Sequence, residues 1–316
     1  MTTTMEARAS REDGRLERYR QAERELWARY GIDPIERFVD LAQPRVRLRL
    51  LEVGSGDPVL FVPGTGGTGP YWAPLVRELR GVRCIMLDRP GWGLSGPVDY
   101  RSGQDYGSLA SMMLRGALDA LALDRVDVVG ASIGNLWALR LSQHEPRRVG
   151  RIVNVGGGPT VDLPVPRFIR LLSSPIGALM VRVPMSPKMI RSQLAALGHE
   201  GSLAEGRMDD FVEWRVAFAR ETPSMRHERA MVRAILGRGG WRPGFIPTEA
   251  ELAAIDKPLL MILGSADPTG SVDTWRRFAT RFANGELQIV EGAGHMAWWD
   301  EPATVGRLVR DFLGRS

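Results

Sequence analysis

The chain has 316 residues, of which 44% are hydrophobic and 25% charged, so it is long enough to bury a large core and has the composition of a soluble globular protein. Its formal net charge is +5, but the basic residues are dispersed among acidic ones without a run of like charge, which argues against nucleic-acid binding. The single cysteine, Cys84, lies in an apolar run, which excludes a disulfide framework and predicts a buried structural thiol.

The N-terminal region lacks the pattern of a secretory signal, because residues 1–30 are charged throughout and contain no apolar core segment. The longest apolar stretch, 168–183, is interrupted by Arg170, Pro175 and Arg182 and falls short of a membrane span. We therefore expect a cytoplasmic protein without stable membrane insertion.

Residues 1–14 are polar and are expected to be loose, whereas residues 15–32 have the apolar spacing and paired charges of a helix. We assign residues 1–35 to a helical extension that precedes the core domain. Two strand-like runs follow at 36–41 and 46–53, and the second ends in a glycine-rich turn. These two strands are expected to pair antiparallel.

A continuous apolar run at 58–64 predicts the next strand, which leads into a glycine-rich loop from Thr65 to Trp72. This loop lacks the lysine and hydroxyl residue of a P-loop and the spacing of a dinucleotide-binding loop, so we interpret it as an anion-stabilising loop of another kind. A further strand and turn at 84–97 contain Asp88. This aspartate is expected to shape the bend, and a catalytic role is the alternative.

The stretch from Val126 to Ser142 has the pattern of a buried strand, a tight turn and a helix, with Ser132 at the corner. Gly130 and Gly134 flank the serine at the two places where such a turn crowds the backbone. This G-x-S-x-G pattern strains the serine backbone and holds its hydroxyl above the sheet. It also directs the N-terminal N–H groups of the next helix at the same point. Ser132 is therefore a candidate nucleophile.

A strand at 151–157 completes the first part of a core domain, which we place at 36–158. The alternation of strands and helices then stops. Residues 159–247 contain three or four helical stretches and no convincing strand, and we interpret them as a helical lid. Alternation resumes at a capping box that begins at Thr248, and two further strands and helices complete the core domain at 248–316.

Two side chains in the last part of the chain complement Ser132. Asp267 follows the end of one predicted strand and His295 the end of the next, so in a doubly wound parallel sheet both lie at the same edge as Ser132. Serine, acid and histidine in this order are typical of a hydrolytic triad. Taken singly, Asp267 has the alternative of a helix N-cap, and His295 that of a loop histidine bonded to a backbone carbonyl.

The three other histidines have no such setting. His144 lies at a helix end, where it is expected to interact with the last carbonyls. His199 and His227 fall in the predicted lid and are expected to face solvent.

The serine turn, the loop VPGTGG, the turn DRPGWGLSGP, the acid loop GSADP and the histidine loop GAGHMAWWDEP together resemble the α/β-hydrolase fold. The resemblance covers about residue 36 to the end, and points to the smaller lidded enzymes: esterases, proline iminopeptidases, cofactor-free haloperoxidases and carbon–carbon bond hydrolases. It implies an α/β fold with a doubly wound, mostly parallel sheet and a helical lid inserted after the sixth strand.

Two N–H groups are expected to stabilise an oxyanion. One belongs to Ile133, the residue after the nucleophile, and by resemblance the other belongs to Thr65. Pro63 and Gly64 precede Thr65 where many relatives have His-Gly, and the proline removes a side chain that is not itself the donor. One such donor lowers the barrier by about 3 to 4 kcal/mol, so the geometry of this loop matters.

The resemblance implies a serine hydrolase that cleaves an ester, lactone or thioester of a small hydrophobic molecule. Ser132 attacks a carbonyl, His295 accepts and returns the proton, and Asp267 orients the imidazole. One alternative is a carbon–carbon bond hydrolase or a biosynthetic cyclase that uses the same triad. A second, from another class, is a ligand receptor that hydrolyses slowly or not at all.

Apolar side chains expected near the triad predict a pocket for a hydrophobic acyl or alcohol group, although large aromatic side chains are equally typical of a core. Carboxylates of the lid keep an amino-terminal peptide substrate open. The sequence contains no metal-binding cluster or cofactor fingerprint, so a small-molecule substrate is the only partner expected, and the oligomeric state is not predicted. The candidate pocket residues are Trp72, Phe211, Trp214, Met296, Trp298 and Trp299.

Overall fold

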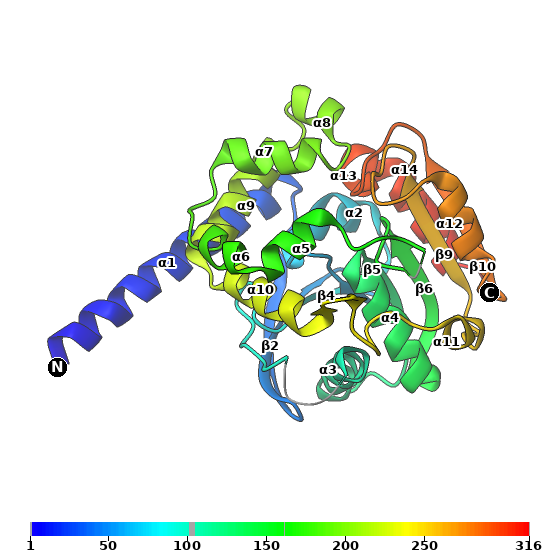
Figure 1. Ribbon diagram of the computed structural model, residues 1–316, viewed down its shortest axis with the longest axis horizontal. Coiled ribbons are helices and arrows are strands. Elements are labelled where there is room, and N and C mark those ends of the chain that lie inside the picture. Colours follow the sequence, from blue (N-terminus) through cyan, green and yellow to red (C-terminus); the bar gives the residue numbers. More distant parts are fainter. Residues whose placement is uncertain (1, 101–104, 161, 316) are drawn as a thin grey trace.

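The computed structural model describes residues 2–100, 105–160 and 162–315, with the side chains of the first helix from residue 13 onward. Its centre is an eight-stranded sheet with the order β1-β2-β4-β3-β5-β6-β9-β10 (Figure 1). β2 pairs antiparallel with β1 and β4, and all other neighbours are parallel, which confirms the predicted sheet. The strands are β1 (Ile35–Ala42), β2 (Arg45–Val53), β3 (Asp57–Val62), β4 (Val82–Asp88), β5 (Val126–Ala131), β6 (Val149–Val155), β9 (Leu259–Gly264) and β10 (Gly285–Val290).

The central strands are buried because helices flank the sheet, and their sequences are correspondingly near-continuous apolar runs. α3 packs against α4, and α2 packs against α14 (Figure 1). Cys84 in β4 is buried as predicted, and burial raises its pKa to about 12. The core helices are η1 (Gly69–Trp72), α2 (Ala73–Glu78), α3 (Tyr106–Ala120), α4 (Ile133–His144), η2 (Pro146–Arg148), α11 (Glu249–Ala253), α12 (Val272–Ala279), α13 (Ala297–Asp300) and α14 (Pro302–Leu313).

The described residues of 159–247, the segment predicted as a lid, contain six helices, where three or four helical stretches were expected. That segment also contains two short strands, β7 (Leu236–Gly237) and β8 (Gly240–Trp241), which pair antiparallel around a two-residue turn. The expectation of no strand there was wrong, because two-residue strands are too short to show a period in the sequence. The helices are α5 (Arg167–Ser173), α6 (Pro175–Met180), α7 (Pro187–Ala195), α8 (Glu200–Ala204), α9 (Asp209–Glu221) and α10 (Ser224–Ile235).

The first helix, α1 (Thr2–Arg29), begins earlier than expected and includes residues predicted to be loose. Residues 2–13 contain neither proline nor glycine, so a helix stabilised by packing farther along can continue through them. Its second half packs against α9, with ion pairs from Arg18 to Glu221 and from Arg29 to Asp210, each at 2.8 Å. The N-terminal half projects away from the body of the molecule (Figure 1).

Within residues 2–100, 105–160 and 162–315, every helix is either too short or too polar to cross a lipid bilayer.

Candidate active site

Ser132 occupies a strained turn between β5 and α4. Its backbone has φ +51° and ψ −116°, in the region that side-chain-bearing residues rarely adopt. The turn is possible because two glycines allow close backbone approach: a Cβ at Gly130 would lie 2.7 Å from the carbonyl oxygen of Gly134, and one at Gly134 would collide with Val62. The G-x-S-x-G pattern therefore folds as the sequence predicts.

Asp267 and His295 form a buried pair at the same edge of the sheet. Asp267 follows β9, and its Oδ2 lies 3.0 Å from Nδ1 of His295, which follows β10. The carboxylate also accepts hydrogen bonds from the N–H of Gly157 (2.9 Å) and from the N–H and hydroxyl of Thr269 (2.9 and 2.7 Å). These contacts fix both carboxylate oxygens.

The pair has altered proton affinities. Burial raises the pKa of Asp267, but the charge of His295 and the hydrogen bonds to the carboxylate outweigh it and hold the pKa well below its usual range. Burial lowers the pKa of His295, and the charge and hydrogen bond of Asp267 more than reverse this, so the net pKa is raised. The arrangement favours a carboxylate beside an imidazole of increased basicity.

Three consecutive glycines after β6 connect the pair to the serine turn. A Cβ at Gly158 would lie 2.7 Å from the carbonyl oxygen of Ser132, and one at Gly156 would lie 3.5 Å from Cε1 of His295 and collide with its carbonyl oxygen. The sequence analysis did not single out these glycines, although a glycine run after a strand was the available signal. The Ser132 hydroxyl makes no hydrogen bond to another described residue, and such contacts often tighten only when substrate binds.

The glycine-rich loop lies directly against Ser132. A Cβ at Gly64 would be 3.1 Å from Cβ of Ser132. Across the described ranges, the backbone N–H groups of Thr65 and Ile133, the two expected oxyanion donors, donate no hydrogen bond to the protein. Both are therefore available to a substrate oxygen.

Arg89 holds this loop from the opposite side. The arginine is fully buried, and its Nη2 donates to the carbonyl oxygen of Gly64 at 2.8 Å. Its guanidinium lies 4.3 Å from the centroid of the Trp92 ring. The Gly64 carbonyl and the Thr65 N–H belong to one planar peptide unit and point in opposite directions, so Arg89 orients this N–H. The sequence analysis missed Arg89, which stands beside Asp88 after an apolar run.

Asp88 shapes the glycine-rich loop and the turn that follows β4. Its carboxylate accepts from the N–H of Gly69 (3.0 Å) and from Nη1 of Arg49 (3.1 Å). Burial raises its pKa to about 6, and Arg49 opposes this shift. Asp88 makes no hydrogen bond to Ser132, Asp267 or His295 among the contacts of the described residues. The geometry thus agrees with the expected shaping role.

Two charged side chains of α9 and α10 also reach this loop. Arg215 lies so close to Gly66 that a Cβ added to this glycine would overlap the guanidinium. Cζ of Arg215 is 4.9 Å from the centroid of the Phe218 ring. Nη1 of Arg215 is buried and has no hydrogen-bond partner in the described ranges. Burial lowers its pKa, which Glu228 opposes. Glu228 accepts from Nε1 of Trp92 at 3.3 Å, and burial raises its pKa. The sequence analysis missed both charged residues.

The six predicted pocket residues are all buried, and the five aromatic ones form one cluster with Tyr71. Trp72 stacks on Trp298 with ring centroids 5.1 Å apart, and Phe211 packs on Trp299 at 4.5 Å. Nε1 of Trp298 and of Trp299 both donate to the carbonyl oxygen of Tyr71. All six belong to the hydrophobic core, the alternative considered above, and a role in lining a pocket stays a prediction for Trp72, Phe211, Trp214, Met296, Trp298 and Trp299.

His199 was expected to face solvent, and this prediction was wrong. It is buried, its Nδ1 lies 2.8 Å from Oδ2 of Asp300, and its Nε2 accepts the N–H of Met296 at 3.1 Å. The carbonyl oxygen of Leu197 accepts the N–H of His295 at 2.9 Å. The segment after α7 therefore packs on the histidine loop and fixes it. This long-range packing explains the burial of His199.

The other two histidines differ from each other. His144 lies in the last turn of α4, as expected, and is exposed, and its interaction with the last carbonyls stays a prediction. The expectation for His227 was wrong, because it is half-buried against Gly91, and burial together with Arg226 lowers its pKa.

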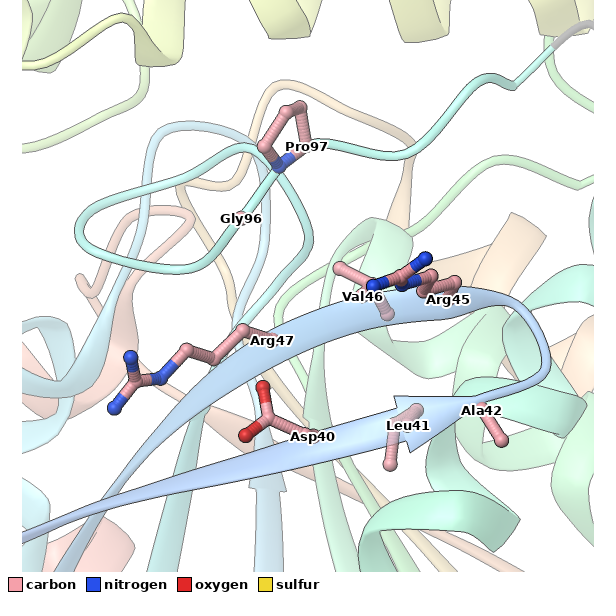
Figure 2. A pocket seen from close by; sticks show the side chains of 8 residues that line it. All are labelled: Asp40, Leu41, Ala42, Arg45, Val46, Arg47, Gly96 and Pro97. Carbon is pink, nitrogen blue, oxygen red and sulfur yellow. The ribbon is translucent and has the colours of Figure 1, made fainter.

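A surface pocket of about 700 Å³ lies away from these residues, at the β1–β2 hairpin (Figure 2). Pro97 and Gly96 of the turn after β4 close one side of it, and none of the predicted site residues lines it. The pocket lining is Asp40, Leu41, Ala42, Arg45, Val46, Arg47, Gly96 and Pro97.

Within the part of the chain that the structure describes, no group of three histidine, cysteine, aspartate or glutamate side chains is arranged to hold a metal ion.

Comparison with known proteins finds a matching family model and similar sequences. The family model described as "Alpha/beta hydrolase family" matches residues 59–308. The chain is 28% identical over 296 residues to 2-hydroxy-6-oxononadienedioate/2-hydroxy-6-oxononatrienedioate hydrolase 2 of Pseudomonas putida, covering 88% of this chain and 96% of that protein. It is 29% identical over 282 residues to the corresponding hydrolase of Paraburkholderia xenovorans (strain LB400), covering 85% and 91%.

Solved structures show the same fold. Carboxylesterase CesB from Bacillus subtilis superposes with a TM-score of 0.76 at 16% identity, covering 95% of this chain and 99% of that one. The 2-hydroxy-6-oxo-6-phenylhexa-2,4-dienoate hydrolase from Rhodococcus sp. strain RHA1 superposes with a TM-score of 0.72 at 17% identity, covering 90% and 100%. At these identities the structural likeness concerns the fold alone.

Proposed function

This chain belongs to the alpha/beta hydrolase family, and from that premise we propose that it hydrolyses a carbon–carbon bond in a small 2-hydroxy-6-oxo dienoate. This is the alternative named by the sequence analysis, and the relatives support it more closely than they support ester hydrolysis. The compound in their names contains no ester, lactone or thioester. It is a ketone joined to an enol acid, so its hydrolysis must break a carbon–carbon bond.

One guanidinium nitrogen of Arg215, Nη1, carries this proposal, because it is buried and has no hydrogen-bond partner among the described residues. A buried donor without a partner is costly, and this cost is removed when an acceptor group of a ligand occupies the site. Arg215 lies against Gly66, in the loop whose Gly64 contacts Ser132. A dienoate brings a carboxylate to this point, and a planar guanidinium binds a carboxylate through two parallel hydrogen bonds. A neutral ester offers no such group.

The chemistry begins with ketonisation of the substrate, in which a proton moves from the 2-hydroxyl to C5, and it continues at the C6 ketone. His295 accepts the proton of Ser132, whose oxygen attacks C6, while the N–H groups of Ile133 and Thr65 stabilise the oxyanion. Asp267 keeps Nδ1 of the imidazole protonated, so that Nε2 is the free base. The raised pKa of His295 favours this proton transfer.

The carbon–carbon bond breaks from the keto tautomer, in which a proton has moved from the 2-hydroxyl to C5. When the oxyanion collapses, the C5–C6 electron pair is delocalised through C3 and C4 into the 2-oxo group and forms a dienolate, which takes up the proton held by His295. C6 stays on Ser132 as an ester. Water activated by His295 then hydrolyses this ester and releases a carboxylic acid and a 2-hydroxypentadienoate.

The test uses the purified full chain and 2-hydroxy-6-oxonona-2,4-dienedioate, whose conjugated absorbance disappears on cleavage. Wild type is expected to consume it, and Ser132→Ala to lose turnover. Arg215→Gln is expected to lower kcat/KM by about 10- to 150-fold, the range for a lost hydrogen bond to a charged group. The exposed Arg226→Gln on α10 is the matched control and should behave as wild type.

Two results would overturn the proposal. Ser132-dependent turnover of p-nitrophenyl esters with no turnover of the dienoate supports the ester hydrolase predicted first. Binding of the dienoate without turnover, with no labelling of Ser132 by a fluorophosphonate probe, supports the receptor alternative.

A further inference from the structure

The net positive charge of the chain resides in one segment. Residues 163–199 contain no aspartate or glutamate and five basic residues. The chain has 42 basic and 37 acidic residues, so outside this segment the two signs balance at 37 each. The basic residues are therefore less dispersed than the composition implied. The five are Arg167, Arg170, Arg182, Lys188 and Arg191.

The same segment exposes most of the large apolar side chains found on the surface of the described chain. Phe168 on α5 is 44% exposed, and Ile176 and Leu179 on α6 are 60% and 65% exposed. Each helix also has a buried side, which includes Leu172 on α5 and Gly177 on α6. The outer faces of α5 and α6 are thus apolar without a covering element. We call this surface the α5–α6 face; its exposed apolar residues are Phe168, Leu171, Ile176, Leu179 and Val183.

Most of the basic residues around the α5–α6 face form no ion pair with another described residue. Arg191 pairs with Asp209 at 2.6 Å. The other four are exposed, and none of them forms an ion pair within the described ranges. α5 packs against α6 and α10, and these helices lie together in Figure 1. Exposed apolar side chains and cations without an ion pair therefore occur together in this segment.

We propose that the α5–α6 face docks on an anionic lipid membrane. Apolar side chains of this kind enter the boundary between headgroups and acyl chains, and interspersed Arg and Lys bind anionic headgroups. Each basic residue near such a surface contributes about a fivefold gain in binding. The charge complementarity favours a lipid surface over a second copy of the chain, whose own α5–α6 face carries the same positive charge. The contact is peripheral and leaves the fold outside the bilayer.

The first measurement is co-sedimentation of the full chain with vesicles. Vesicles of phosphatidylcholine alone are compared with vesicles of phosphatidylcholine and phosphatidylglycerol in equal parts. We expect binding to the anionic vesicles only, and its loss at about 1 M salt, where charges are screened within about 3 Å.

Two double variants test the two components. Arg167→Gln/Arg182→Gln is expected to weaken binding about 25-fold, and Ile176→Ser/Leu179→Ser at least tenfold, by about 1.4 kcal/mol or more. The matched controls are Arg147→Gln/Arg307→Gln and Ile35→Ser, which change exposed residues elsewhere and should bind as wild type. Because every substituted side chain is exposed, all variants should keep the thermal midpoint of wild type.

Equal binding to both vesicle types, no binding to either, or undiminished binding by Ile176→Ser/Leu179→Ser would overturn the proposal. It is also overturned if wild type forms a dimer that this variant converts to a monomer and no vesicle binding occurs. In that case the α5–α6 face is an interface between two copies.

Discussion

At the scale of single residues, Asp267 and His295 stabilise each other's charged forms. Burial acts against both charges, yet the pKa of Asp267 is lowered and that of His295 raised, because the two groups lie 3.0 Å apart. A base works only in its neutral form. The raised pKa therefore places the acid limb of the kcat/KM profile above about pH 6.5, the value of free imidazole.

Asp267→Asn should move this limb to lower pH. The substitution removes the negative charge, and burial, which lowers the pKa of His295, then dominates. The maximal rate should fall about 10⁴-fold because the imidazole tautomer is no longer held. The measurement is kcat/KM against pH, with the exposed Asp273→Asn on α12 as control. A limb that stays in place or rises would contradict the assigned pairing.

Arg89→Met tests the orientation of the peptide between Gly64 and Thr65. Loss of the 2.8 Å hydrogen bond to the Gly64 carbonyl should let the Thr65 N–H turn away from the oxyanion, lowering kcat about tenfold with little change in KM. Arg89→Lys, which keeps a donor, should recover part of the rate. The exposed Arg80→Met is the control. An unchanged kcat in folded Arg89→Met would show that the loop holds its own geometry.

Sequence reasoning found Ser132, Asp267 and His295 because each directly follows a strand, so their positions depend on local pattern and chain order. It missed Arg89, Arg215 and Glu228 because their surroundings come from distant elements. Arg215 on α9 reaches Gly66, about 150 residues earlier in the chain, and no local period in the sequence records this contact.

At the scale of elements, α1 is more than an extension ahead of the core. Glu23 on α1 pairs with Arg49 on β2 at 2.7 Å, and Arg49 in turn pairs with Asp88. The hydroxyl of Tyr19 lies 2.9 Å from that of Thr68 in the glycine-rich loop. These buried contacts tie the helix to the loop beside Ser132.

Glu23→Gln should therefore destabilise the whole fold. It leaves the buried Arg49 with only Glu36 and Asp88, and breaking a buried pair from one side costs about 3 kcal/mol. The measurement is the free energy of unfolding in urea at neutral pH. Glu25→Gln, an exposed position two residues along the same helix, should change it by less than about 0.5 kcal/mol. Equal small effects of both substitutions would mean that the cluster contributes no net stability.

Element boundaries were predictable where the signals are local. α4 begins directly after the serine turn, and α14 begins at Pro302, so each start has a local signal in the sequence. The start of α1 was not predictable, because polar residues with no apolar stripe become helical only by continuation from a packed segment.

At the scale of the whole molecule, the alternation of strands and helices was enough to predict a mostly parallel sheet and the edge of it at which Ser132, Asp267 and His295 lie. The same alternation does not identify the kind of bond that the protein cleaves. A Ser-Asp-His arrangement serves esters and ketones alike, and Arg215, on which the proposed acidic ketone substrate rests, comes from α9 and not from a strand of the sheet.

The packing of α1 on α9 also affects the chain during its synthesis, because the ribosome makes the two helices at different times. Arg18 and its partner Glu221 are 203 residues apart in the chain. At about 5 to 20 residues per second, the ribosome makes α9 about 10 to 40 s after α1. Throughout that interval Tyr19 on α1 lacks the ring of Phe218 on α9, against which it packs. A nascent chain of this protein is thus expected to need chaperone protection at its first helix until synthesis passes residue 221.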